Sequence, residues 1–82
     1  MLLTSEQCRA ARALVGWSQD ELSAASSVAK ATIANFELGS RKPYARTLRD
    51  LREALEAAGV RFMAAGEQVP GGAGVRFGSA GK

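Results

Sequence analysis

Apolar residues recur at three- and four-residue intervals through most of the first 58 positions of this chain. This spacing places them along one side of a helix, so it predicts amphipathic helices. The positions that we expect to face a core are Cys8, Ala11, Leu14, Val15, Leu22, Ile33, Phe36, Leu48, Leu51, Leu55 and Ala58. The pattern therefore predicts a mainly α-helical unit over residues 1–58.

Capping signals divide this unit into separate helices. Thr4 with Gln7, and Ser18 with Glu21, have the spacing of a capping box, in which each residue of a pair satisfies a backbone donor of the other. Glycines that we expect to end helices are Gly16, Gly39 and Gly59. The predicted helices span about residues 5–15, 19–25, 30–38 and 45–58, and Val28 is an isolated apolar residue in the turn before the third.

The last third of the chain has a different pattern. Residues 60–63 (VRFM) and 75–77 (VRF) alternate apolar and basic side chains, which is the period of a half-buried strand. The eleven residues between the two GVRF copies are too many for a two-residue hairpin turn, and Pro70-Gly71-Gly72 is the expected bend. We expect a Gly-rich extension over residues 59–82 that forms a β-hairpin or separate β-strands. Its glycine content also suits the alternative of a tail without fixed structure.

Composition narrows the classes of function. The 82 residues include no histidine and one cysteine, and the formal net charge is +3. We therefore expect no metal site, no cofactor and no enzyme activity, because no Cys/His or Ser/His couple and no phosphate-binding glycine motif is available. The chain has no leader pattern and no apolar run of about 18 residues, so we expect no membrane segment and a cytoplasmic protein. The positive charge favours an anionic partner.

A longer motif points to a family. The run WSQDELSAASSVAKATIANFELGSRKP resembles the helix-turn-helix of phage-repressor-like (Cro/C1-type, XRE) bacterial DNA-binding proteins. The residues that carry the resemblance are Arg12, Gly16, Trp17, Ser18, Gln19, Leu22, Ile33, Glu37, Gly39, Lys42 and Pro43. The resemblance covers about residues 9–55 and implies a lambda-repressor-like bundle of four to five short helices. In such a bundle the third helix enters the major groove of DNA and the second crosses the DNA backbone.

The resemblance also assigns roles to individual residues. It implies an ion pair between Arg12 and Glu37 that ties the first helix to the third. The positions corresponding to readers of base edges in double-stranded DNA are Lys30, Ala31, Ala34 and Asn35. The positions expected on the DNA backbone are Ser18, Gln19, Thr32, Ser40, Arg41, Lys42 and Arg46. A plain capped helix start is the alternative for Ser18 and Gln19, and a solvated helix face is the alternative for Arg46.

Two positions depart from the family pattern. Ser27 stands where glycine is frequent in the turn, and Ala29 stands where Ser or Thr usually caps the third helix. Alanine is a poor cap, at a cost of ~0.5–2 kcal/mol. We expect Ser26 or Ser27 to cap the third helix instead, or else a loose first turn.

The combined expectation is a sequence-specific transcriptional regulator that acts as a repressor. One small domain binds DNA weakly at physiological salt, so we expect a homodimer. The extension is the expected dimerisation element, through Val60, Phe62, Val75 and Phe77. One alternative is an antitoxin-like module that binds a toxin-like partner protein and regulates its own operon. Another is a helix-turn-helix retained only as a scaffold.

Overall fold

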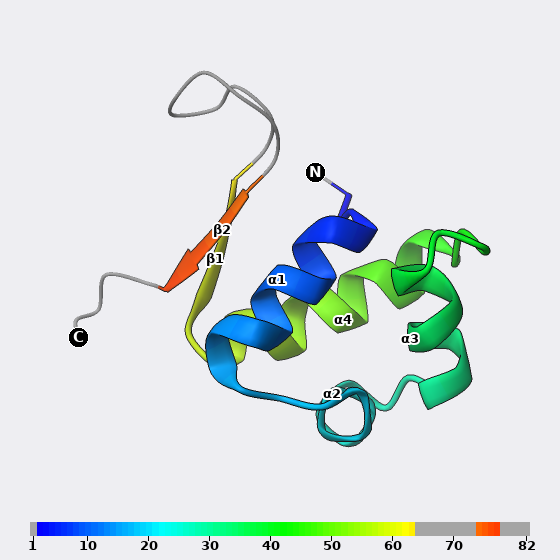
Figure 1. Ribbon diagram of the computed structural model, residues 1–82, viewed down its shortest axis with the longest axis horizontal. Helices are drawn as coiled ribbons and strands as arrows, with labels where there is room; N and C mark the ends of the chain where they lie inside the picture. The colour runs from blue at the N-terminus through cyan, green and yellow to red at the C-terminus, as the bar shows by residue number, and fades with distance from the viewer. Residues whose placement is uncertain (1, 64–73, 78–82) are drawn as a thin grey trace.

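The computed structural model describes residues 2–63 and 74–77, and Val75 is the residue of the second segment whose side chain is described. The described elements, in chain order, are α1 (Ser5–Val15), α2 (Gln19–Ser26), α3 (Lys30–Glu37), α4 (Ala45–Ala57), β1 (Val60–Met63) and β2 (Gly74–Phe77). The helices form a bundle, and the strands form a ribbon beside α1, at the end of the molecule away from α3 (Figure 1). The predicted mainly α-helical bundle is confirmed.

The two predicted capping boxes begin α1 and α2. Thr4 Oγ1 accepts from the backbone N of Gln7 at 3.0 Å, and Thr4 N donates to Gln7 Oε1 at 3.0 Å. Ser18 Oγ accepts from the backbone N of Glu21 at 3.1 Å, and Ser18 N donates to Glu21 Oε1 at 2.7 Å. Each box satisfies two backbone donors that a helix start otherwise leaves exposed. The sequence therefore located both helix starts correctly.

The turn between α2 and α3 differs from the expectation. Ser27 ends α2 in the left-handed region at φ 63°, a conformation that favours glycine. Ser26 Oγ donates to the oxygen of Leu22 and accepts from the backbone N of Val28, so it serves the turn. No side chain caps α3 at Ala29, so of the two alternatives the substitute serine cap is excluded, and the looseness of the first turn stays a prediction. Val28 is also not an isolated turn residue, because its side chain is buried in the core.

The core lies where α4 meets the other elements. Its buried apolar residues are Leu3, Cys8, Ala11, Leu22, Val28, Ile33, Phe36, Leu48, Leu51, Leu55 and Val60. Each large side chain among them stabilises the fold by ~1.5–3 kcal/mol relative to an exposed position. Leu14, Val15 and Ala58, also predicted to face inward, are half-buried at the margin. The helical period thus identified most of the core correctly.

The two strands pair with each other in an antiparallel register. Val60 lies opposite Phe77, and Phe62 lies opposite Val75. Val60 is 1% exposed within the helical core, and Phe62 and Val75 pack against that core as half-buried residues. Strand β2 begins at Gly74, one residue before the prediction. The expected bend at residues 70–72 and the side chain of Phe77 lie outside the described residues.

Candidate nucleic-acid interface

A buried carboxylate at the end of α3 joins α3 to α1 and α2. Glu37 is 4% exposed. Arg12 Nε lies 2.7 Å from Glu37 Oε2, and Arg12 Nη2 lies 2.7 Å from Oε1, so the guanidinium binds both oxygens. Gln19 Nε2 also donates to Oε1 at 3.1 Å, and Cys8 Sγ donates to Oε2 at 3.2 Å. Arg12 and Glu37 therefore form the ion pair that the resemblance implied, inside a larger cluster.

This cluster shifts the pKa values of three groups. Burial raises the pKa of Glu37, but the hydrogen bonds from Arg12, Gln19 and Cys8 outweigh burial and hold that pKa below its usual value. The hydrogen bond to Glu37 raises the pKa of Arg12. Burial, followed by the hydrogen bond to Glu37, raises the pKa of the Cys8 thiol. The ion pair is thus charged at neutral pH, and Cys8 is a neutral core thiol.

Backbone contacts extend this connection. Arg12 Nη1 donates to the oxygen of Trp17 at 2.9 Å, which holds the link between α1 and α2. Arg9 Nη1 donates to the backbone oxygen of Glu37 at the end of α3. Hydrogen bonds to charged groups of this kind contribute ~1.5–3 kcal/mol each. They fix α3 relative to α1 and α2 and set which side of α3 faces outward.

The outer side of α3 carries the residues predicted to read bases. Lys30, Ala31 and Asn35 are exposed, and Ala34 is half-buried. The opposite side carries the buried residues Ile33, Phe36 and Glu37. The structure therefore brings the four predicted readers together on one surface. Two of the four are alanines, which offer a methyl group and no hydrogen bond to a base.

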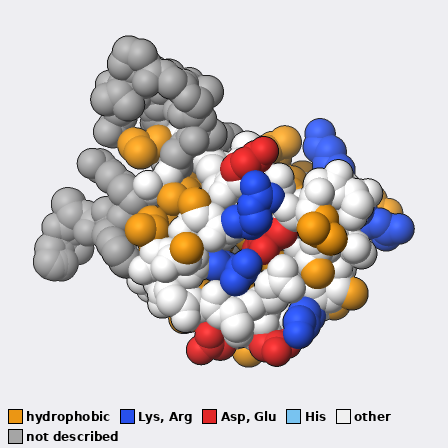
Figure 2. All heavy atoms as spheres, in the orientation of Figure 1, with side chains coloured by type: hydrophobic (Ala, Val, Ile, Leu, Met, Phe, Trp, Pro, Cys, Tyr) orange, Lys and Arg blue, Asp and Glu red, His pale blue; other side chains and the backbone are white. Residues whose placement is uncertain are grey.

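A basic hollow lies beside this surface. It has a volume of about 340 Å³ and is lined by Thr32, Arg41, Lys42, Pro43, Tyr44 and Thr47. Tyr44 is 87% exposed, and its hydroxyl and that of Thr47 are suitable donors to phosphate. In Figure 2, basic side chains stand around the α3 end of the molecule and acidic side chains lie over α2. Of this lining, Thr32, Arg41 and Lys42 were predicted from the sequence to contact the DNA backbone, and Tyr44 and Thr47 were not.

Comparison with known proteins identifies the family. Residues 9–58, more than half of the chain, match the family model described as Helix-turn-helix, of the Cro/C1 (XRE) type. The chain belongs to this family. It is therefore a DNA-binding regulator of the XRE type, and its family is not typically enzymatic. A search of curated proteins finds no match to the chain.

Several residues that were assigned to the DNA backbone have partners within this helix-turn-helix protein. Ser18 uses its amide and hydroxyl in the capping box of α2, and Gln19 donates to Glu37. Ser40 donates both its backbone N and its hydroxyl to the oxygen of Asn35, at 3.0 and 3.1 Å. Ser40 therefore closes the end of α3, a role that the sequence analysis did not foresee. Gln19 still has a second amide hydrogen for an external acceptor.

One of the predicted readers, Lys30, has an acidic neighbour. Lys30 Nζ lies 3.3 Å from Asp20 Oδ1, which joins the start of α3 to the start of α2. The Lys30 side chain is 56% exposed and that of Asp20 is 73% exposed. Ion pairs this exposed contribute ~0–1 kcal/mol, so DNA can displace Asp20 from Lys30 at little cost. Lys30 and Asp20 are ten residues apart, so rules for pairs three or four residues apart on one helix do not predict this ion pair.

The arginines of α4 differ from one another. Arg52 Nε lies 3.8 Å from Glu56 Oε2, as its four-residue spacing predicts. Arg49 and Glu53 have the same spacing but form no ion pair, and neither Arg49 nor Arg46 has an ion pair with any residue that the structure describes. Both side chains are exposed. Within residues 2–63 and 74–77, this helix-turn-helix protein therefore has two cations near the start of α4 that form no ion pair.

Among the residues that the structure describes, no helix is long and apolar enough to cross a membrane. No group of three or more Asp, Glu, His or Cys residues in the same segments is placed to hold a metal ion.

Proposed function

We propose that this protein is a sequence-specific transcriptional repressor that binds its operator as a homodimer, with α3 in the major groove. The observation that carries the proposal is the outer side of α3, fixed by the Glu37 cluster and flanked by the basic hollow. A helix held in this way presents its side chains to base edges at low entropic cost.

The chemistry of each predicted reader on α3 suggests which base it contacts. Lys30 suits guanine O6 and N7, and Asn35 suits adenine N6 and N7. Ala31 and Ala34 suit the methyl group of thymine. The residues proposed to contact the DNA backbone are Gln19, Thr32, Arg41, Lys42, Tyr44, Arg46 and Thr47. We leave out Ser18 and Ser40 because both are engaged within the protein: the Ser18 amide donates to Glu21 and its hydroxyl accepts from Glu21, and the amide and hydroxyl of Ser40 both donate to Asn35.

The β ribbon supports the homodimer. Strands β1 and β2 form a two-stranded sheet, so each has an edge without a strand partner among residues 2–63 and 74–77. Isolated two-stranded sheets are marginal in water, and exposed edges tend to pair with other strands. Two ribbons joined edge to edge would form a four-stranded sheet, with Val60 in each helical core and Phe62 and Val75 available at the interface. Phe77 is proposed to join them.

Selection of binding sites from random duplexes tests the DNA contacts. Asn35→Ala should relax the choice of base at one position, with a loss of ~1–3 kcal/mol in discrimination. Lys42→Ala should weaken binding to all sequences alike and lower the slope of log affinity against log salt by about 1. Arg61→Ala is the matched control, because it removes one exposed charge from β1. Identical selected sequences for Asn35→Ala and the wild type contradict the assignment of α3.

Light scattering on the full-length chain tests the oligomer. A mass of two chains, at the concentrations used for DNA binding, is the expected result, and a single-chain mass overturns the homodimer. The ribbon edges also favour a second candidate, an antitoxin-like module that regulates its own operon. In that case the chain alone is monomeric and forms a stable complex when produced together with a toxin-like protein encoded beside it.

A further inference from the structure

An exposed leucine lies between two hollows on the surface where α1 and α4 begin. Leu2 is 57% exposed. One hollow, of about 310 Å³, is lined by Leu2, Leu3, Ala45, Arg46, Leu48, Arg49 and Arg52. The other, of about 450 Å³, also includes Leu2, Leu3 and Leu48. The hollows share Leu2, which is exposed, and Leu3 and Leu48, which are buried beneath it, and we call the two hollows together with Leu2 the leucine surface.

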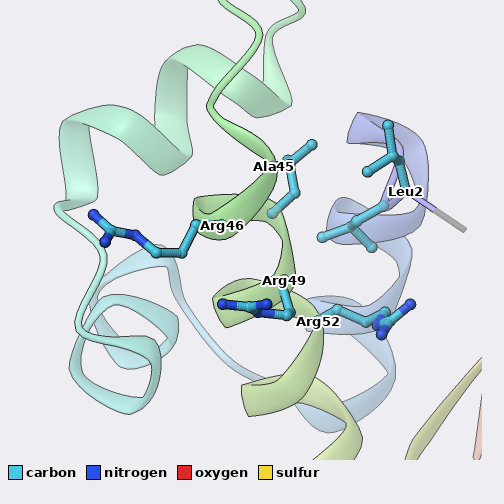
Figure 3. Close-up of a pocket in the computed structure, with 7 residues that line it drawn as sticks. Leu2, Ala45, Arg46, Arg49 and Arg52 are labelled. Carbon is cyan, nitrogen blue, oxygen red and sulfur yellow. The ribbon is translucent and has the colours of Figure 1, made fainter.

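Cations border the leucine surface on both sides. The first hollow has Arg46, Arg49 and Arg52 along α4, and the second has Arg41 and Lys42 from the loop after α3. Glu6 lines the second hollow, and the described residues that line the first include no acidic side chain. In Figure 3, Leu2 and Ala45 lie on opposite sides of the first hollow, and Arg46 and Arg52 extend to opposite sides of α4. In this view the guanidinium group of Arg52 lies on the same side of α4 as Leu2, and that of Arg46 lies on the other side.

Two cations of this surface have no ion-pair partner in the part of the chain that the structure describes. Arg46 and Arg49 have no ion pair with a described residue, and the pair of Arg52 with Glu56 is long, at 3.8 Å. A duplex would satisfy these cations but would leave Leu2 without an apolar contact. An occupant that suits both features has carboxylates beside a large apolar side chain.

We propose that the leucine surface is a docking site for an acidic segment of a partner protein. Leu, Phe or Trp of the segment packs against the exposed Leu2, and its Asp or Glu side chains bind Arg49 and the neighbouring cations. Buried apolar anchors of this kind usually supply most of the affinity, and the surrounding charges supply orientation and rate of association. The proposal thus specifies the partner by its charge and its anchor.

Docking would also regulate DNA binding; this regulatory role rests on the proposed function. Arg46 lines the first hollow, Arg41 and Lys42 line the second, and all three are proposed to contact the DNA backbone. Because one guanidinium or ammonium cannot bind a phosphate and a partner carboxylate fully at the same time, the two ligands compete. An acidic partner would then release the protein from its operator.

Selection of peptides tests the docking site without DNA. The probe is a displayed library of random 16-residue peptides, selected on the immobilised full-length protein. The expected winners combine Asp or Glu with a large apolar residue, and their affinity falls at least tenfold for Leu2→Ser and for Arg49→Gln. The matched controls are Leu38→Ser, at a leucine that is 81% exposed and lines neither hollow, and Arg61→Gln on β1. Absence of enrichment, or winners that bind all four variants equally, overturns the proposal.

A second measurement separates docking from DNA binding. A winning peptide is added to the complex of the protein with its selected duplex, and release of the duplex is the expected result. A stable complex of protein, peptide and duplex overturns the proposed regulation of DNA binding. Peptide binding by a protein that binds no duplex would reject the proposed function and leave the docking site standing, whereas the reverse result would reject the docking site alone.

Discussion

Gln7 Nε2 donates to the backbone oxygen of Met63 at 3.0 Å, which joins the first turn of α1 to the last residue of β1. The same side chain accepts from the backbone N of Thr4 through Oε1. Gln7 is 2% exposed, and an amide can fill both roles because it carries donors and acceptors. One side chain thus completes a helix cap and anchors the ribbon to the helices.

Replacement of Gln7 by Glu should separate these two roles. The carboxylate keeps an acceptor for Thr4 but has no donor for the oxygen of Met63, and it places a charge in a buried position. We expect a loss of at least ~1–3 kcal/mol in the free energy of unfolding, measured with urea, and faster hydrogen exchange in β1. Thr4→Ala is the control, since it removes only the cap, at ~0.5–2 kcal/mol. Equal exchange rates in β1 for both variants would contradict the anchoring role of Gln7.

Glu37→Gln should be among the more destabilising single changes in the helical part. It keeps the shape of the side chain but leaves the Arg12 guanidinium without its counter-charge. Breaking a buried pair costs ~3–5 kcal/mol, and we expect the lower end because the Arg12 side chain is 20% exposed. Urea unfolding measures the effect. Arg52→Gln is the comparison, because its pair with Glu56 is more exposed and should contribute no more than ~0.5 kcal/mol. Similar losses for the two variants would show that the Glu37 cluster has no special role in stability.

The stability of the protein should fall in acid in a way that depends on Glu37. The pKa of Glu37 is lower in the folded protein than in the unfolded chain, where glutamate has a pKa of about 4.3. The unfolded state therefore takes up the proton first as the pH falls, and the stabilisation present above this value is lost on approach to the folded pKa. Unfolding at several pH values between 7 and 3 should show the difference between wild type and Glu37→Gln shrinking. A constant difference would exclude this linkage.

Asp20→Asn should increase the affinity for DNA. The change releases Lys30 from a carboxylate 3.3 Å away and removes a negative charge beside the proposed path of the phosphates. The expected gain is a few-fold, with a small loss of stability because Asp20 also suits the first turn of α2, at ~0.3–1 kcal/mol. Affinity for the selected duplex at two salt concentrations tests it. Glu53→Gln, an equal change of charge towards the end of α4, is the control, and equal gains would mean that only net charge matters.

Local signals in the sequence were sufficient for the helices. The capping boxes at Thr4 and Ser18 and the glycine at Gly16 act within a few residues, so their geometry can be read from spacing. The stripe of leucines in α4 likewise predicts its buried side. The motif around Glu37 added the link between α1 and α3, which spacing could not provide because 25 residues separate Arg12 from Glu37.

Contacts between residues far apart in the sequence could not be predicted from these local signals. The bond from Gln7 to Met63 spans 56 residues and depends on where the ribbon packs. Val28 was predicted to be a turn residue because a single apolar side chain shows no helical or strand periodicity. In the structure the turn directs this side chain into the core. Tyr44 and Thr47 have no motif of their own, and only the fold places them beside Arg41 and Lys42. The leucine surface arises in the same way, from segments that meet only in three dimensions.

The burial of Val60 determines where the helical domain can be cut for use in another protein. The family match ends at residue 58, but Val60 is 1% exposed in the core that the helices build. A cut after Gly59 would remove ~1.5–3 kcal/mol of burial from a domain whose total stability is of the order of 5 kcal/mol. A chimeric regulator that borrows these helices should therefore carry β1 across the junction. The segment that matches the family is therefore shorter than the segment that has to be transferred to keep the core complete.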